Sequence, residues 1–295
     1  MNSIRPCHCG QIVGIAIVLS ATAFTGLSLE RHTSAQTQAP LVEPDEATKA
    51  RLQGIVNGVL AIWDKFDVVC LGESHGSKND SDLRIALIEH PAFIRKVKVI
   101  IVEFADSVHQ DILDQLALEG EDIPREKLRA VWKDTSGKAV WELPIYEAFL
   151  RAVRKVNLAV PRSQRVRLIA GDNSTERNRG GFIREAISQE ILSKGLKALA
   201  IYGSGHCQCR GMGFPGELES EYPGKIWSAF SFIGAEGVSE GQRVFGLGDE
   251  PKLIPITGTD SGWLRAPALA EKPSYSQDRG LRAEMAGPLR RHSVC

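Results

Sequence analysis

The sequence predicts an α/β fold with a mainly parallel or mixed central sheet and helices on both faces. Apolar runs of strand length alternate along the chain with segments in which apolar residues recur at helical spacing. The strand runs are continuously apolar, which is typical of parallel sheets buried on both faces. Several of them end in glycine and polar residues, at the position where open α/β sheets place functional groups.

Local signals indicate where the predicted elements begin and end. Pro91 stops the helix that follows the first strand, and Ser77 or Asn79 can cap the start of that helix. Gly195 suits a left-handed cap after the last long helix. The helices between the second and third strands form an insertion. The predicted strands are 66–71, 97–103, 166–170 and 197–202, with short strands at 227–233, 244–245 and 253–256; the predicted helices are 46–63, 80–90, 107–118, 125–132, 144–157 and 174–193.

Residues 1–35 are predicted to be a secretory signal peptide. Arg5 precedes an apolar stretch at 12–29, and Thr33-Ser34-Ala35 offers small residues for cleavage. Polar residues interrupt the apolar stretch, so a cleaved signal is favoured over a retained membrane anchor. The mature protein is therefore expected to be periplasmic or extracellular, with no stable membrane span. The expected organisation continues with a polar leader at 36–45, a single α/β domain at 46–262 and a disordered tail at 263–295.

The charge pattern disfavours nucleic-acid binding. The 36 basic and 36 acidic residues give a formal net charge of zero and are scattered among one another. A nucleic-acid interface needs a concentrated basic face to neutralise phosphates. The expected partner is instead a small-molecule or peptide substrate, and the sequence makes no prediction of oligomeric state.

Four cysteines lie outside the predicted signal: Cys70 in a strand, Cys207 and Cys209 just after the second histidine motif, and Cys295 as the last residue. Cys70 ends a strand and is expected to be an inert core thiol. In an oxidising compartment Cys295 can pair with either Cys207 or Cys209. Thiolate ligation of a metal by the Cys-x-Cys pair is the less favoured alternative.

Polar residues at the strand ends are the main functional signal. Gly72-Glu73-Ser74-His75 and Gly203-Ser204-Gly205-His206 each follow an apolar strand, and two further strands end in Glu103 and Asp172. Because the carboxyl ends of parallel strands meet at one edge of a sheet, these groups are expected to share a site. The candidate catalytic residues are Glu73, His75, Glu103, Asp172 and His206.

Two imidazoles and a carboxylate are a ligand set suited to a divalent transition metal such as Mn, Co, Zn or Fe. The candidate ligands are His75, Glu103 and His206, and a carboxylate outside this set would act as general base. Without a metal, one histidine oriented by a carboxylate can take a proton from water while the other protonates the leaving group. The sequence leaves both versions open.

These motifs resemble those of the ChaN-like proteins, whose wider superfamily includes the Tiki and TraB proteins and the erythromycin-esterase-like hydrolases. The similarity lies in the two glycine–histidine turns and in Val102-Glu103-Phe104 followed by Gln110 and Leu113-Asp114, within about residues 55–235. It implies a mixed sheet with flanking helices and a cleft at the motif edge. It also implies that His75, Glu103 and His206 are catalytic or metal-binding residues.

The resemblance implies more than one activity. Tiki-like members imply a metal-dependent peptidase, erythromycin-esterase-like members a lactone hydrolase, and ChaN-like members haem-iron binding without catalysis. We therefore expect an exported hydrolase of ester, lactone or amide bonds, with a haem-iron or metal-binding protein as the alternative. Within the insertion, Trp132, Trp141 and Tyr146 either form a lid over the site or pack the insertion on the sheet, and packing is favoured.

Overall fold

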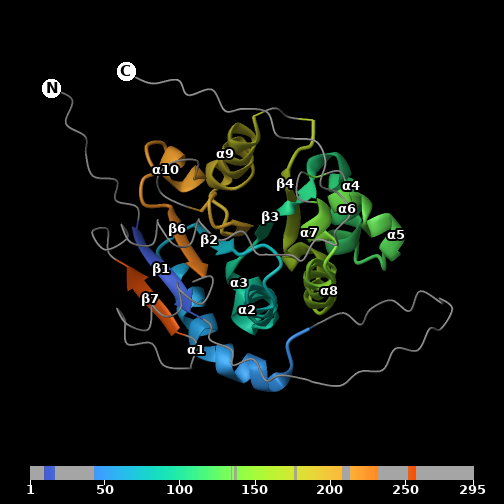
Figure 1. The fold of residues 1–295 in the computed structure, drawn as a ribbon, viewed down its shortest axis with the longest axis horizontal. Coiled ribbons are helices and arrows are strands. Elements are labelled where there is room, and N and C mark those ends of the chain that lie inside the picture. Colours follow the sequence, from blue (N-terminus) through green and yellow to red (C-terminus); the bar gives the residue numbers. More distant parts are fainter. Residues whose placement is uncertain are drawn as a thin grey trace, which may run out of the picture.

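The computed structural model describes residues 10–16, 43–133, 135, 138–175, 178–207, 213–231 and 252–256. These residues form a seven-stranded sheet in the order β4-β3-β5-β2-β6-β1-β7, with helices on both sides (Figure 1). All neighbouring strands are parallel except β1 and β7, which are antiparallel. The predicted α/β fold with a mainly parallel sheet is therefore confirmed. The strands are β1 (Gly10–Ala16), β2 (Val68–Glu73), β3 (Val99–Asp106), β4 (Arg167–Asp172), β5 (Ala198–Gly203), β6 (Ile226–Ser231) and β7 (Lys252–Ile256).

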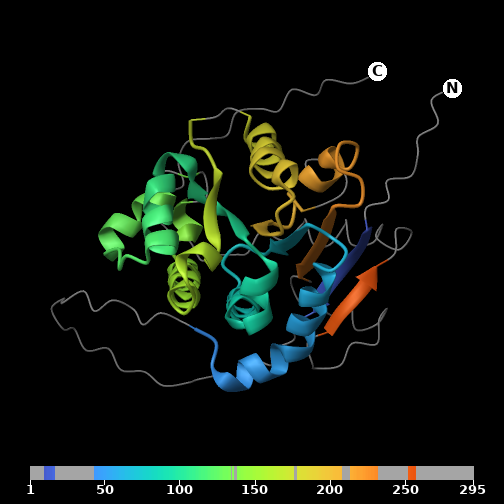
Figure 2. The same ribbon diagram turned by 180° about the vertical axis from the view of Figure 1, so that it is seen from behind.

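The helices cover the two faces of the sheet in separate groups (Figure 2). Alternate strand residues point to opposite faces, so each strand contributes to two cores. Val69 and Leu71 of β2 pack with helices such as α1, α2 and α8, whereas Val68 and Cys70 pack with α9 and α10. The helices are α1 (Glu46–Ile62), α2 (Lys78–Glu89), α3 (Pro91–Lys96), η1 (Ser107–His109), α4 (Gln110–Asp114), η2 (Gln115–Glu119), α5 (Arg125–Leu128), α6 (Ala130–Lys133), α7 (Lys138–Trp141), α8 (Pro144–Leu158), η3 (Arg162–Gln164), α9 (Arg179–Glu190), η4 (Leu192–Lys194) and α10 (Phe214–Leu218).

The predicted helix signals act as expected at several ends. The Ser77 hydroxyl accepts from the Asp80 backbone N–H at the start of α2, and Pro91 begins α3 as its first residue. Gly195 adopts a left-handed conformation with φ of 62°, here after η4. The predicted insertion between β3 and β4 is present, and it runs from η1 to η3.

The strands reach further toward their carboxyl ends than predicted. β2 includes Glu73, and β3 continues through Glu103 to Asp106. Both carboxylates therefore stand on strand backbone rather than on loops. Glu73 is paired with Gly203 of β5, whereas Glu103 lies where the register of β3 against β4 shifts, between Val102 and Asp106.

Several predicted segments fall partly or wholly outside the described residues. These are the short strand at 244–245, the tail at 263–295 and most of the leader at 36–45. β1 lies within the predicted signal peptide and pairs with both β6 and β7, and this pairing does not test whether the segment is cleaved. In the part of the chain that is described, no helix combines the length and apolar character needed to cross a bilayer.

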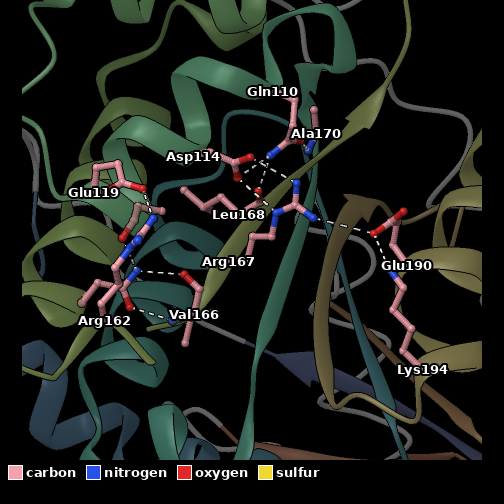
Figure 3. A network of polar contacts seen from close by, with 12 residues as sticks. Gln110, Asp114, Glu119, Arg162, Val166, Arg167, Leu168, Ala170, Glu190 and Lys194 are labelled. Atoms are coloured by element: carbon pink, nitrogen blue, oxygen red, sulfur yellow. Dashed lines mark hydrogen bonds and ion pairs between the residues drawn. The ribbon is translucent and has the colours of Figure 1, made fainter. Parts of the chain in front are cut away.

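The edge strand β4 is covered by side chains of the insertion (Figure 3). The Gln110 amide donates to the Leu168 carbonyl and accepts from the Ala170 N–H, each over 2.8 Å. Asp114 accepts two hydrogen bonds of 3.1 Å from Arg167. Gln110 and Asp114, two residues of the motif that resembles ChaN-like proteins, thus protect a sheet edge from pairing with another strand.

Candidate functional site

Four of the five predicted site residues converge because they stand on, or directly after, three adjacent strands. β5 lies between β3 and β2, and Glu73 at the end of β2 is in register with Gly203 at the end of β5. Glu103 stands on β3 on the other side of β5. Two histidine–carboxylate pairs form where these strands end.

The first pair joins His75 to Glu73. His75 Nδ1 lies 2.8 Å from Glu73 Oε1, and this oxygen also accepts a 2.9 Å hydrogen bond from the Tyr146 hydroxyl. The second carboxylate oxygen, Oε2, is ion-paired with Arg84, whose side chain is as buried as that of Glu73. All of these groups converge on one carboxylate, which is therefore held at the Nδ1 edge of the His75 ring.

The surroundings shift the pKa values of this pair in opposite directions. Burial alone would raise the pKa of Glu73, but the Arg84 charge and the hydrogen bonds from His75 and Tyr146 lower it below its ordinary value. Burial alone would lower the pKa of His75, but the hydrogen bond to Glu73 and the charges of Glu103 and Glu73 raise it. The arrangement thus favours an ionised Glu73 and a protonated His75.

The second pair joins His206 to Glu103. His206 Nε2 lies 3.4 Å from Glu103 Oε1, while Oε2 accepts a 2.6 Å hydrogen bond from the Gly203 backbone N–H. Burial would raise the pKa of Glu103, but His206, the His75 charge and the Gly203 N–H lower it below its ordinary value. These contacts favour an ionised Glu103, a carboxylate of β3 that accepts a hydrogen bond from the end of β5.

Gly203 brings the two pairs together. A β-carbon at this position would stand 2.9 Å from His75 Nε2 and 3.4 Å from Glu103 Oε2. The next residue, Ser204, donates its backbone N–H and its hydroxyl to the Glu73 carbonyl over 3.0 and 3.1 Å. The two histidine turns are thus tied directly to each other across β2 and β5.

The His75 ring has one covered side and one accessible side. Trp141 of α7 packs edge-on against it, with ring centroids 4.6 Å apart. The His75 side chain nevertheless keeps 41% of its surface exposed, and His206 keeps 23%, whereas Glu73 keeps 3% and Glu103 6%. The imidazoles are therefore accessible to a substrate, whereas the buried carboxylates can only orient and polarise the imidazoles.

Asp172, the fifth predicted site residue, lies in a different part of the same sheet edge. It is in register with Asp106 of β3, and its Oδ1 accepts a 2.9 Å hydrogen bond from the Asn173 N–H. β4 is separated from β2 by β3 and β5. A catalytic role for Asp172 stays a prediction.

A disulfide fixes the second histidine turn, and it corrects the expectation that Cys70 is a free core thiol. Cys70 of β2 is bonded to Cys207, with a Cα–Cα distance of 5.9 Å. Cys207 therefore pairs with Cys70 rather than with Cys295, which lies outside the described residues. Since Cys207 follows His206 directly, the crosslink ties the turn that carries His206 to β2.

The predicted metal ligands already have partners among the protein's own groups. No three or more His, Cys, Asp or Glu side chains are arranged to hold a metal ion within the described parts of the chain. Nδ1 of His75 is occupied by Glu73, and both Glu103 oxygens already have partners. A divalent metal on His75, Glu103 and His206 stays a prediction, and the chemistry below is derived from the side chains alone.

The fold and site together define an α/β protein with paired histidine–carboxylate groups at the carboxyl ends of its strands. No protein-family model matches the chain, and no curated protein matches it. The resemblance to ChaN-like, Tiki, TraB and erythromycin-esterase-like proteins therefore stays a prediction.

Solved structures give weak similarities. The RRSP effector domain of a MARTX toxin from Vibrio vulnificus CMCP6 is 20% identical with a TM-score of 0.33, over 55% of this chain and 33% of that one. The type III effector HopBA1 is 15% identical with a TM-score of 0.38, over 53% and 75%. A structure described as bacterial protein toxins is 16% identical with a TM-score of 0.41, over 70% and 40%. This chain thus spans about a third of the first of these proteins, and similarities at this level carry no functional argument.

Proposed function

We propose that the protein is an exported hydrolase of ester, lactone or amide bonds that works by acid–base catalysis. The observation that carries this proposal is the pairing of two accessible imidazoles with two buried carboxylates at adjacent strand ends. A histidine held by a carboxylate is a proton-transfer group whose ring orientation and tautomer are fixed. Two such groups beside each other supply both a base and an acid.

His75 is the group that we assign as general acid. The ionised Glu73 carboxylate can only accept, so Nδ1 of His75 carries the hydrogen of their 2.8 Å contact. The remaining nitrogen, Nε2, lies beside Gly203. When His75 is protonated, its Nε2–H is the proton available to a leaving group.

His206 is the group that we assign as general base. Its Nε2 faces Glu103 Oε1, which leaves Nδ1 to take a proton from water. As that proton leaves, the water oxygen bonds to the substrate carbonyl carbon and forms a tetrahedral intermediate. The intermediate collapses by breaking the carbon–oxygen or carbon–nitrogen bond, and His75 Nε2–H protonates the departing atom. Proton exchange with solvent restores both histidines.

The proposal is tested by hydrolysis of p-nitrophenyl esters, a chromogenic lactone and a peptide amide. We expect His75→Ala and His206→Ala each to lower kcat/KM by about a hundredfold or more on the substrate that is turned over. His109→Ala is the matched control. His109 also follows a strand of this sheet edge, and it begins α4 without a side-chain capping hydrogen bond, so its removal should not disturb that helix. Turnover that is unchanged in both His75 and His206 variants would contradict the proposal.

Two further measurements separate the alternatives. Loss of turnover on chelation, together with Mn, Co, Zn or Fe in the purified protein, would assign the metal-dependent version with His75, Glu103 and His206 as ligands. A Soret band in the purified protein that disappears in His75→Ala or His206→Ala, without turnover of any substrate, would assign the haem-binding alternative. Amino-terminal sequencing of the secreted protein tests cleavage near residue 35.

A further inference from the structure

The Tyr146 hydroxyl hydrogen-bonds to one residue that precedes His75 in the sequence and to one that follows it. It donates to Glu73 Oε1 over 2.9 Å and accepts from the Gly76 backbone N–H over 2.8 Å. Tyr146 belongs to α8, 70 residues further along the chain than Gly76. One hydroxyl from the insertion thus holds the two ends of the short turn on which His75 stands.

The direction of both hydrogen bonds is fixed by chemistry. A backbone N–H can only donate, so the tyrosine oxygen accepts from Gly76 and keeps its own hydrogen for another partner. That partner is Glu73, whose ionised carboxylate can only accept. Gly76 has a φ of 83°, a left-handed conformation in which the chain turns sharply just after His75. The hydroxyl therefore ties this glycine turn to the carboxylate that orients the imidazole.

The packing around Tyr146 keeps the hydroxyl in place. Its side chain is 1% exposed, and its ring lies 4.8 Å from Trp141 and 4.9 Å from Phe104, measured between centroids. The Arg84 guanidinium carbon lies 6.0 Å from the centre of the same ring. Trp141 in turn packs against His75. Tyr146 thus lies in a buried aromatic cluster that also contacts His75 through Trp141.

We propose that Tyr146 is a positioning residue: its hydroxyl braces Glu73 and the Gly76 turn, and thereby fixes the His75 ring with Nε2 directed toward Gly203 and Glu103. The insertion between β3 and β4 then completes the site instead of only covering the sheet. The consequence for catalysis rests on the proposed function, whereas the consequence for the His75 ring does not. Without the hydroxyl, Gly76 loses its hydrogen-bond partner and Oε1 of Glu73 keeps only His75.

The test is Tyr146→Phe, which removes the hydroxyl and keeps the ring. The readout is the 15N shifts of the His75 ring nitrogens, recorded at alkaline pH where the ring is neutral. We expect the wild type to show hydrogen on Nδ1, and Tyr146→Phe to shift both ring signals because Glu73 and the Gly76 turn no longer hold the ring in one position. With an active substrate we expect kcat to fall about tenfold or more while KM stays within about twofold.

Two control variants separate positioning from general loss of stability. Tyr222→Phe removes another hydroxyl, which contacts Ser188 over 3.0 Å in the opposite core. Val153→Ala weakens the core that contains Tyr146 without removing a polar group. Both are expected to leave the His75 ring shifts unchanged, even where Val153→Ala lowers Tm.

The outcomes are distinguishable. Ring shifts in Tyr146→Phe identical to those of the wild type would overturn the positioning role, whatever the activity. Altered shifts in a protein that hydrolyses nothing would leave the positioning role standing and contradict the proposed function. Should Tyr146→Phe fail to fold, the same hydrogen bonds are tested in the wild type. We expect the Tyr146 hydroxyl proton to exchange slowly with water and to show a nuclear Overhauser contact to the Gly76 amide proton. Absence of that contact would overturn the positioning role.

Discussion

The backbone of Gly203 lies directly against the ring of His75. A β-carbon at Gly203 would stand 2.8 Å from Cε1 and 2.9 Å from Nε2 of His75, which is closer than such contacts occur. The same residue donates its N–H to Glu103. Glycine at this position thus lets the two histidine–carboxylate pairs approach each other.

Gly203→Ala is expected to displace the His75 ring. Because neighbouring groups hold Glu73 rigidly, the ring must rotate away from the new methyl group, and a misplacement of about 1 Å costs about a hundredfold in rate. The measurement is kcat/KM together with thermal unfolding. Gly205→Ala is the matched control in the same turn, because a β-carbon added at Gly205 would meet no neighbouring atom within 4 Å. Equal activity of Gly203→Ala and Gly205→Ala would contradict the close contact between Gly203 and the His75 ring.

Much of this site was predictable from the sequence because it depends on local signals. Apolar strand runs followed by glycine and histidine indicated Glu73, His75 and His206, and an apolar run ending in a carboxylate indicated Glu103. Arg84 was not identified as a site residue, and Tyr146 was expected to pack the insertion on the sheet rather than to contact Glu73. They reach Glu73 from helices, and only the packing of α2 and α8 on the sheet brings them there. The sequence signal for Arg84 is its position in α2, where this charged residue stands between the apolar residues Leu83 and Ile85.

Removing the buried Arg84 charge is expected to destabilise the fold. Arg84→Met leaves the Glu73 carboxylate, whose side chain is 3% exposed, without its cationic partner. The free energy of unfolding should fall by about 3 kcal/mol, since breaking one side of a buried pair leaves an uncompensated charge. Urea unfolding checks this, with Arg129→Met as control because its pair with Glu142 is solvent-exposed. Similar midpoints for the two variants would argue against a buried ion pair.

The disulfide could not be assigned from the sequence, because its partners are 137 residues apart and meet only when β2 packs beside β5. Cys70→Ala/Cys207→Ala is expected to lower the free energy of unfolding by about 2–5 kcal/mol. It should also lower kcat, since the turn that carries His206 loses its attachment to β2. Peptide mapping without reductant is expected to give a Cys70–Cys207 crosslink. A reductant should lower the Tm of the wild type and leave the double variant unchanged.

Gln110→Ala is expected to uncover the edge of β4. Figure 3 shows the Gln110 amide against the strand, where it satisfies the Leu168 carbonyl and the Ala170 N–H. Losing both bonds should cost about 1–3 kcal/mol and increase aggregation on heating, because an open strand edge pairs with other chains. Gln53→Ala is the control, since Gln53 is exposed and contacts only Asn57 in the structure. Light scattering during thermal unfolding distinguishes the two variants.

Glu89 connects three helices and makes stability depend on pH. At the end of α2 it contacts Lys49 of α1 over 2.8 Å and Lys155 of α8 over 2.9 Å. Burial would raise the pKa of Glu89, but the two lysines lower it below its ordinary value of 4.5. A carboxylate with a lowered pKa in the folded state stabilises the fold above its ordinary pKa, and this contribution is lost as the pH falls through the folded value.

Glu89→Gln is therefore expected to unfold more easily than the wild type at neutral pH and equally easily in acid. Because Glu89 is only partly buried, solvent screens both contacts, and the difference at neutral pH should be about 0.5 kcal/mol. It should shrink as the pH falls below 4.5 and vanish below the lowered pKa of Glu89 in the folded protein, where the carboxylate is protonated in both the folded and the unfolded states. Denaturant titrations at a series of pH values measure the difference, and 1 M salt should reduce it at neutral pH. A difference that persists in acid would mean that packing, rather than charge, joins the three helices at this residue.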